Sequence, residues 1–240
     1  MKRNVLSLVL VCLTLVLITV GPAFGAEASS LPDERIRDAT KVLMEISKQE
    51  DSGTMCDLLA KAEGVAIFPQ VVKAGLMLGA RYGKGIVLKR DYFTGQWYGP
   101  SFLEMTGLSY GFQIGVQSTA LVLVITNERG MKSFEEGSFT FGGDVAIAAG
   151  PVGRHLEAGT DIQLKSAIYS YSMSKGAFVG LSLEGAKIKP DEAANELYWR
   201  HHAPSVELLQ TEAAGSEIEP LIMELNELVL KGGGRILALN

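Results

Sequence analysis

Residues 121–125, Leu121-Val122-Leu123-Val124-Ile125, form an apolar run without a polar break. Successive side chains of a β-strand point to opposite faces of the sheet, so this run is apolar on both faces. The pattern is typical of a central strand that is covered on both sides. Similar short runs at 65–68 and 85–88 alternate with turn-forming residues, and 20 of the 27 glycines lie within residues 64–187. Residues 64–187 are therefore predicted to form a β-rich core, a barrel or a sandwich with glycine at its bends.

Helical patterns flank this core on both sides. Over 30–62, apolar residues recur at helical spacing behind Pro32, which suits a first helical turn. Over 190–231, two prolines each precede a helix start, and three glycines at 232–234 end the last helix. The chain shows no Ser/Pro-rich linker and no internal repeat. The sequence therefore predicts one α+β domain over 30–231, with a barrel-like or sandwich core, followed by a tail at 232–240.

The first 25 residues have the layout of a secretory signal peptide. Two basic residues precede a mostly apolar run over 5–20, and small residues follow it. Cleavage is predicted after Gly25, with cleavage after Ala28 as the alternative. An uncleaved anchor is the other interpretation, but the run is shorter than the roughly 20 residues that a helical span needs. The sequence thus predicts an exported protein, periplasmic or secreted and peripheral to a membrane.

Composition and charge limit the classes of function. The chain has 22 Lys and Arg against 27 Asp and Glu, a net charge of −5, and removal of 1–25 would make it −7. This acidic balance argues against a general nucleic-acid binder, which needs a basic surface. Cleavage would leave Cys56 as the one cysteine, so no internal disulfide could form. Cys56 is predicted to be a buried apolar residue, with pairing to another chain as the alternative.

Two predicted strands, 109–116 and 169–176, carry an unusual face of small residues. Alternation puts Gly, Ser and Gln on one side of the first strand and three serines on one side of the second. Such a face lets another group approach the backbone closely, with hydroxyls available for hydrogen bonds. Close packing within the sheet, exposure to solvent and a site for a polar ligand or headgroup are the interpretations that remain open.

Motifs that resemble catalytic sites lack the context that the chemistry needs. Residues 107–111 match G-x-S-x-G around Ser109, but the residues that follow alternate like a strand, whereas a nucleophile elbow requires a strand-to-helix turn. Residues 79–85 resemble a phosphate-binding loop with one spacer missing and Gly85 in place of Ser or Thr, and we predict a hairpin there. The three histidines have no Cys or carboxylate cluster beside them. The sequence predicts no enzyme, no metal and no cofactor.

Several segments of the core follow one another in the order of a known family. They are 64–69 with 73–75, 82–85 with 90 and 95–100, 109–115, 144–154, 169–180, and Asn195 with Leu197-Tyr198. Together these segments resemble the SYLF domain family, a lipid-binding family that includes the actin-binding domain of yeast endocytic proteins. The resemblance covers residues 35–200.

The resemblance implies a β-rich core with flanking helices, no catalytic residues and binding to membrane phospholipid. In an acidic chain, such binding requires a local basic cluster. The candidate lipid-binding residues are the basic side chains of the matched segments, Lys73, Arg81, Lys84, Arg90, Arg154 and Lys175. A solvated rim of hairpin charges is the alternative interpretation of the same residues.

Two hypotheses of function follow. The first is an exported, non-catalytic phospholipid-binding module of the cell envelope that recognises an anionic headgroup. The second is an exported structural or protein-interaction domain that uses its sheet edge or C-terminal helices without a lipid ligand. The family's actin binding is not expected under either hypothesis, because an exported protein does not meet cytoplasmic actin.

Overall fold

The computed structural model describes residues 31–49, 52–150, 166–234 and 236, and for 76–78 and 109–115 it describes the backbone alone. The predicted signal peptide over 1–25, with its cleavage sites, and most of the tail over 235–240 therefore lie outside the described residues. Within the described ranges, no helix combines the length and the apolar character that crossing a membrane would require.

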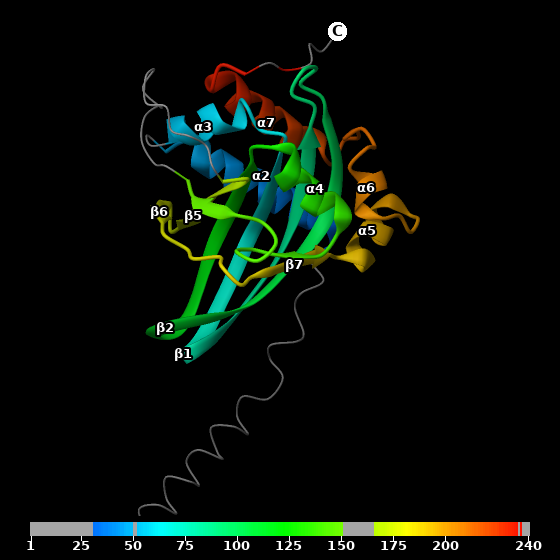
Figure 1. Ribbon diagram of the computed structural model, residues 1–240. Helices are drawn as coiled ribbons and strands as arrows, with labels where there is room; N and C mark the ends of the chain where they lie inside the picture. Colours follow the sequence, from blue (N-terminus) through cyan, green and yellow to red (C-terminus); the bar gives the residue numbers. More distant parts are fainter. Residues whose placement is uncertain (1–30, 50–51, 151–165, 235, 237–240) are drawn as a thin grey trace, which may run out of the picture. The chain divides into compact units, whose positions relative to one another are not determined.

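The core is a seven-stranded sheet that curls into a half-barrel (Figure 1). Its path runs β3-β7-β2-β5-β4, with β1 paired to β2 and β6 paired to β5. The pairs are antiparallel apart from β4 with β5. The predicted α+β class is confirmed. The strands are β1 (Gly64–Arg90), β2 (Trp97–Ile125), β3 (Phe139–Thr140), β4 (Ile147–Ala149), β5 (Ile168–Ser174), β6 (Ala177–Val179) and β7 (Lys187–Pro190).

Two long strands replace the several short ones that the sequence predicts. β1 has 27 residues and β2 has 29, and they pair along their whole length. The hairpin predicted at 79–85 is wrong, because this segment lies inside β1. Glycines in these strands mark close contacts between backbones as well as turns, and a sequence pattern does not separate the two uses.

β1 folds back over itself. A Cβ atom on Gly64 would lie 2.6 Å from the carbonyl oxygen of Leu88, and one on Gly85 would lie 2.6 Å from the oxygen of Ile67. Gly83 faces the segment at 70–71 in the same way, at 3.1 Å. These contacts are centred near residue 77, where the register of β1 on β2 also shifts. We call the long pair of β1 and β2 the ribbon. The ribbon therefore turns back at the end where the labels β1 and β2 stand (Figure 1).

Two apolar clusters form, one on each face of the sheet, as Leu121–Ile125 predicts. One cluster joins even-numbered residues of β2, such as Val122, to helices α2, α3 and α7. The other joins odd-numbered residues, such as Leu123, to Met131 and Phe134 of α4. All five residues of the run 121–125 are fully buried.

The helices follow the predicted segments. Cys56 in α3 is buried and unpaired, as expected of a small apolar residue, and burial raises the pKa of its thiol. Asp191 caps α5 by accepting from the backbone N–H of Ala194. The helices are α2 (Pro32–Ser47), α3 (Gly53–Leu59), α4 (Glu128–Glu136), α5 (Glu192–Trp199), α6 (Ser205–Leu208) and α7 (Glu219–Lys231).

The fold-back makes a prediction about Gly85. Gly85→Ala would place a methyl group 2.6 Å from the Ile67 oxygen and from the ring of Phe68. We expect a loss of about 2 kcal/mol or more in the free energy of unfolding, measured by urea titration. Gly180→Ala is the matched control, because nothing lies within 4 Å of its Cβ position. Equal stability of the two variants would contradict the fold-back.

Candidate functional site

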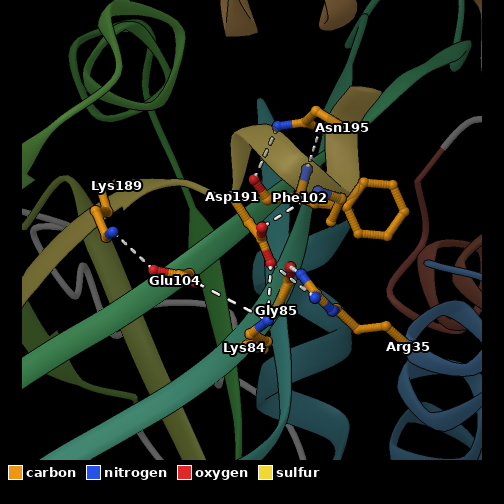
Figure 2. A network of polar contacts seen from close by, with 9 residues as sticks. Arg35, Lys84, Gly85, Phe102, Glu104, Lys189, Asp191 and Asn195 are labelled. Atoms are coloured by element: carbon orange, nitrogen blue, oxygen red, sulfur yellow. Dashed lines mark hydrogen bonds and ion pairs between the residues drawn. The ribbon is translucent and has the colours of Figure 1, made fainter. Parts of the chain in front are cut away.

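A buried network of charges joins five elements on the α2 side of the sheet (Figure 2). Arg35 of α2 donates to Asp191 at 2.9 Å and to the carbonyl oxygen of Gly85 at 3.3 Å. Lys84 of β1 lies 3.4 Å from the same Asp191 carboxylate. Glu104 of β2 continues the network to Lys189 of β7 at 2.8 Å. The network therefore ties the second half of β1 and the first half of β2 to α2, which precedes them in sequence, and to the start of α5, which follows them.

An amide pair completes this junction. Asn195 of α5 accepts from the backbone N–H of Phe102 at 2.7 Å and donates to the Phe102 oxygen at 3.1 Å, as the dashed lines between these two residues in Figure 2 show. The Arg35 guanidinium lies 5.2 Å from the centre of the Phe102 ring. Both the backbone and the ring of Phe102 thus anchor β2, and Asn195 fixes α5 against the edge of the sheet.

The charge state of Asp191 follows from these contacts. Burial alone would raise the pKa of this carboxyl group. The hydrogen bond and charge of Arg35, the N–H of Ala194 and the charge of Lys84 outweigh burial and hold the pKa below its usual value. The carboxylate is therefore ionised and fully engaged at neutral pH. These contacts give Asp191 a structural role.

The catalytic motifs find no catalytic setting. Ser109 lies within the continuous strand β2, so the strand-to-helix turn of a nucleophile elbow is absent there. His201 is exposed and its ring contacts the Trp199 oxygen, whereas His155 lies outside the described residues. In the part of the chain that the structure describes, no three His, Cys, Asp or Glu side chains gather as a metal site would require.

Two of the predicted lipid-binding residues have internal partners. Arg90 is fully buried, donates to the Ala60 oxygen at the end of α3 and lies 5.8 Å from the Trp97 ring centre. Lys84 belongs to the Asp191 network. A headgroup cannot reach Arg90 without opening the core, so the expectation for this residue is corrected. The sequence around Lys84 and Arg90 resembles that of hairpins, and it gave no sign that these side chains have internal partners.

The other candidates lie toward the fold-back. Lys73 is half-buried on β1, Arg81 is buried on the same strand, and Lys175 is exposed at the turn between β5 and β6. Arg154 lies outside the described residues. Lys73 pairs in register with Gln117, and the Ser174 hydroxyl donates to the Ser118 oxygen. Lys73 and Lys175 therefore flank β2 on opposite sides, about 10 Å apart by strand spacing.

The serine face of β5 is used inside the sheet. Ser170 donates to the Ala148 oxygen, and Ser172 donates to the Val179 oxygen. These bonds tie β5 to its neighbours, so close packing is the correct interpretation for this strand. For the small-residue face of 109–115 the structure describes the backbone alone, so the interpretations of that face stay predictions.

Among the described residues of the sheet, two large apolar side chains are exposed at the fold-back end of the ribbon. We call residues 72–82 of β1 and 107–118 of β2 the ribbon bend. Leu108 is 68% exposed and Val116 is 72% exposed, and both lie on the face that α2 covers farther along. The ribbon bend contains Lys73 and Arg81 and no Asp or Glu. Sequence reasoning missed this surface, although the lack of acidic residues in an acidic chain was a visible signal.

A second exposed apolar feature lies at the other end of the ribbon. The turn between β1 and β2 carries Phe93, which is 85% exposed, and Tyr92, whose ring meets it edge to face. The Asp91 carboxylate accepts from the backbone N–H groups of Phe93 and Thr94 and fixes the turn. A cavity of about 420 Å³ lies beside these rings and is also lined by Tyr98.

Comparison with known proteins gives matches over most of the described chain. A family model described as "Ysc84: Las17-binding protein actin regulator" matches residues 106–228. The SH3 domain-containing YSC84-like protein 1 of Xenopus laevis is 39% identical over 143 residues, 59% of this chain and 42% of that protein. Protein YSC84 of Saccharomyces cerevisiae is 37% identical over 155 residues, 63% of this chain and 33% of that protein. LAS seventeen-binding protein 3 of the same species is 36% identical over 146 residues, 60% and 31%. The chain spans less than half the length of these relatives.

These matches correct the predicted localisation. Relatives with SH3 domains, in a family described as Las17-binding actin regulators, belong with the actin cytoskeleton and not outside the cell. The prediction of an exported, periplasmic or secreted protein is therefore wrong. It depended on the basic and apolar pattern of 1–25, which lies outside the described residues. The argument against actin depended on export and falls with it.

The buried network predicts a coupled loss of stability. Asp191→Asn or Arg35→Met alone removes the 2.9 Å ion-pair partner of a buried charge, and each should cost about 3 kcal/mol of unfolding free energy. Because each change removes the same pair, the double variant should lose clearly less than the sum. Urea unfolding of the four proteins measures this coupling, and strict additivity would contradict it.

The same pair predicts a pH dependence. The folded pKa of Asp191 is below its unfolded value, so its contribution is complete above about pH 4 and is lost as pH falls through the folded pKa. The acid loss of stability should be smaller in Asp191→Asn than in the wild type. Exposed Asp144→Asn at the β3 turn is a control carboxylate outside the network.

Proposed function

The chain belongs to the Ysc84 family, also called the SYLF domain family, and from this premise we propose that it is a non-catalytic domain that binds anionic phospholipid surfaces. The ribbon bend is the proposed contact surface. The observation that carries this proposal is the exposure of Leu108 and Val116 at 68% and 72%, in a part of the ribbon whose sequence contains no acidic residue.

The apolar face of the ribbon bend suits the boundary between lipid headgroups and acyl chains. Leu108 pairs with exposed Ala80, and Val116 pairs with Ala74, so these four residues share one face of the ribbon. Cross-strand partners of an antiparallel pair point the same way. Each CH₂ group that enters the bilayer contributes about 0.8 kcal/mol, so two large side chains supply several kcal/mol.

Local charge supports the same orientation. The chain is acidic overall, yet the ribbon bend contains no acidic residue and contributes Lys73, and the β5–β6 turn contributes Lys175. Arg81 is buried and is not part of this surface, and Asp38 and Glu45 of α2 line a pocket with Lys175. A lysine near an anionic surface contributes about 1 kcal/mol, and its long stem lets the ammonium reach the headgroups. Repulsion of the acidic remainder would keep the rest of the domain away from the membrane.

The charge requirement predicts salt-sensitive binding. The full chain should co-sediment with vesicles of phosphatidylcholine containing about 30% phosphatidylserine, and less at high salt. Lys73→Gln with Lys175→Gln should weaken binding about 30-fold at low salt, from a loss of about 2 kcal/mol. Leu108→Gln with Val116→Thr should also weaken binding, and without a change in the salt dependence.

Two matched controls lie away from the ribbon bend. Lys132→Gln removes an exposed lysine from α4, and Met223→Gln removes an exposed apolar side chain, 62% accessible, from α7. Both controls should bind vesicles like the wild type. The proposal fails if the wild type pellets with no anionic vesicle, or if the controls lose binding as much as the ribbon-bend variants.

A protein partner is the second candidate, and the turn at 91–96 favours it. LAS seventeen-binding protein 3 is named for a protein partner, and the family description names an actin regulator. Phe93, held outward by the Asp91 turn, has the character of an aromatic anchor for a partner's pocket.

Phe93→Ser tests this second candidate. It should abolish most binding to purified Las17 or to actin filaments, because truncation of a central aromatic anchor costs about 2 kcal/mol or more. Vesicle binding should not change, because the turn lies at the opposite end of the ribbon from its bend. Met223→Ser is the control. If Phe93→Ser binds Las17 and actin filaments as tightly as the wild type and this control do, the turn at 91–96 is not the contact surface for a protein partner.

A further inference from the structure

The cavity beside the turn at 91–96 is used by neither of the two candidate functions. It lies where both ends of β1 come near the end of α6, and its volume is about 420 Å³. Sites for small ligands and single side chains in proteins have volumes from roughly 300 Å³ upward. Tyr92 and Phe93 are 46% and 85% exposed, and their ring centres lie 5.7 Å apart. The rings of Tyr92, Phe93 and Tyr98 therefore give the cavity an aromatic border that solvent can reach.

Two carboxylates line the same cavity. Glu63 directly precedes β1, and its backbone is fixed because its N–H donates to the Ile125 oxygen and its oxygen accepts from the Arg90 N–H, each at 2.8 Å. The Asp91 carboxylate accepts from two backbone N–H groups of the turn, which stabilise its negative charge without neutralising it. Among the described side chains, no lysine or arginine forms an ion pair with the Glu63 carboxylate. The cavity therefore combines aromatic rings with a negative charge.

The two basic residues of the lining are engaged elsewhere. The Lys89 ammonium lies 2.7 Å from the carboxylate of Glu135 on α4. Arg90 is fully buried and donates to the Ala60 oxygen at the end of α3. Both side chains thus have partners outside the cavity, and its carboxylates remain available to a ligand.

The protonation of Glu63 reflects this environment. Burial raises the pKa of its carboxyl group most, and the charges of Glu128 and Asp91 raise it further. The charges of Lys89 and Arg90 act in the opposite direction and do not cancel the rise. A carboxylate that is partly desolvated and lies beside like charges is stabilised by an incoming cation. The electrostatic environment thus supports what the geometry indicates.

We propose that this cavity receives an arginine side chain of a partner protein, with its guanidinium against the aromatic rings and beside Glu63. The proposal deepens the second candidate function and rests on the turn at 91–96 being a protein contact surface, not on membrane binding. Charge complementarity determines the occupant. An anionic group would meet two like charges, and an apolar side chain would desolvate Glu63 without compensating its charge.

The aromatic border favours arginine over lysine. A planar guanidinium can lie on the face of a ring while its N–H groups donate to a carboxylate. An ammonium group is more strongly hydrated and loses more when it leaves water. The contact would be reciprocal, because Phe93 enters the partner while the partner's arginine enters beside Phe93. The turn and the Glu63 backbone are already fixed, so few groups need to be ordered on binding.

A short peptide tests the charge assignment by NMR. The probe is a blocked pentapeptide of alternating glycine and arginine, added to the isotope-labelled full chain at constant ionic strength. The amide signals of Phe93 and Thr94 should shift and approach saturation by about 20 mM peptide, as a millimolar Kd requires. The same peptide with citrulline, which is neutral and similar in shape, should give no saturating shift. The lysine version should bind about 5-fold more weakly.

Variants of the cavity locate the binding. Glu63→Gln should weaken binding of the arginine peptide about 10-fold, and Phe93→Ser about 5-fold. Glu196→Gln is the matched control, because Glu196 is exposed and lines a separate cavity of about 300 Å³ that also contains other glutamates. The control removes the same charge and should bind the peptide like the wild type. If Glu63→Gln does not fold, Phe93→Ser decides, because its side chain is exposed.

Three results would overturn the proposal. They are no saturating shift up to about 50 mM arginine peptide, equal binding of the citrulline peptide, and an equal loss of binding in Glu63→Gln and Glu196→Gln. Leu108→Gln with Val116→Thr should keep peptide binding, because these residues lie at the opposite end of the ribbon.

Failure of this proposal and failure of the second candidate function are distinguishable. If the arginine peptide binds while Phe93→Ser leaves binding to Las17 and actin filaments unchanged, the arginine site stands and these two proteins are not its partners. If Phe93→Ser abolishes their binding but the arginine peptide does not bind, the turn is a contact surface and the assignment to arginine is wrong.

Discussion

The length of β1 is the constraint from which the rest of the architecture follows. Its 27 residues would extend about 90 Å if straight, whereas a compact unit of about 210 residues has a radius of gyration near 17 Å. The strand must therefore turn back within the domain. It turns near residue 77, and its two arms pack together at Gly64, Gly83 and Gly85, where backbone approaches backbone at distances that a side chain would forbid. The curled sheet therefore results from the length of the ribbon and from the glycines along it, which have no side chain.

The turn-back creates two ends with different environments. Near the body, the second half of the ribbon is fixed to α2 and α5 by Arg35, Asp191 and Asn195, and its charges are paired. At the ribbon bend, no described helix covers the outer face, so Leu108 and Val116 stay in contact with solvent. A rigid, buried junction thus holds an exposed apolar and basic edge in a fixed orientation. Groups held in a fixed orientation lose less conformational freedom when they meet a surface, because they are ordered before contact.

Local pattern predicted the parts of the fold that local physics determines. Leu121–Ile125 predicted a strand covered on both faces, and Pro32, Pro190 and Pro204 marked the starts of helices. The extent of β1 and β2 was missed, because glycine within a strand and glycine at a turn look alike in sequence. The family resemblance was confirmed, whereas the localisation inferred from residues 1–25 was not. Hydrophobic pattern reports how a segment partitions, not where the whole protein acts.

The candidate site shows most clearly what sequence alone cannot supply. Lys84, Arg90, Arg81 and Lys175 are all basic residues beside glycines or turns, and nothing in their neighbours ranks them. Their roles diverge because of contacts made by distant segments: Asp191 meets Lys84, the end of α3 meets Arg90, and only a turn surrounds Lys175. Arg81 is buried by the fold-back itself, 5% exposed and without an acceptor. Contacts between distant segments, and not the local sequence, therefore separate the buried basic residues from the exposed ones.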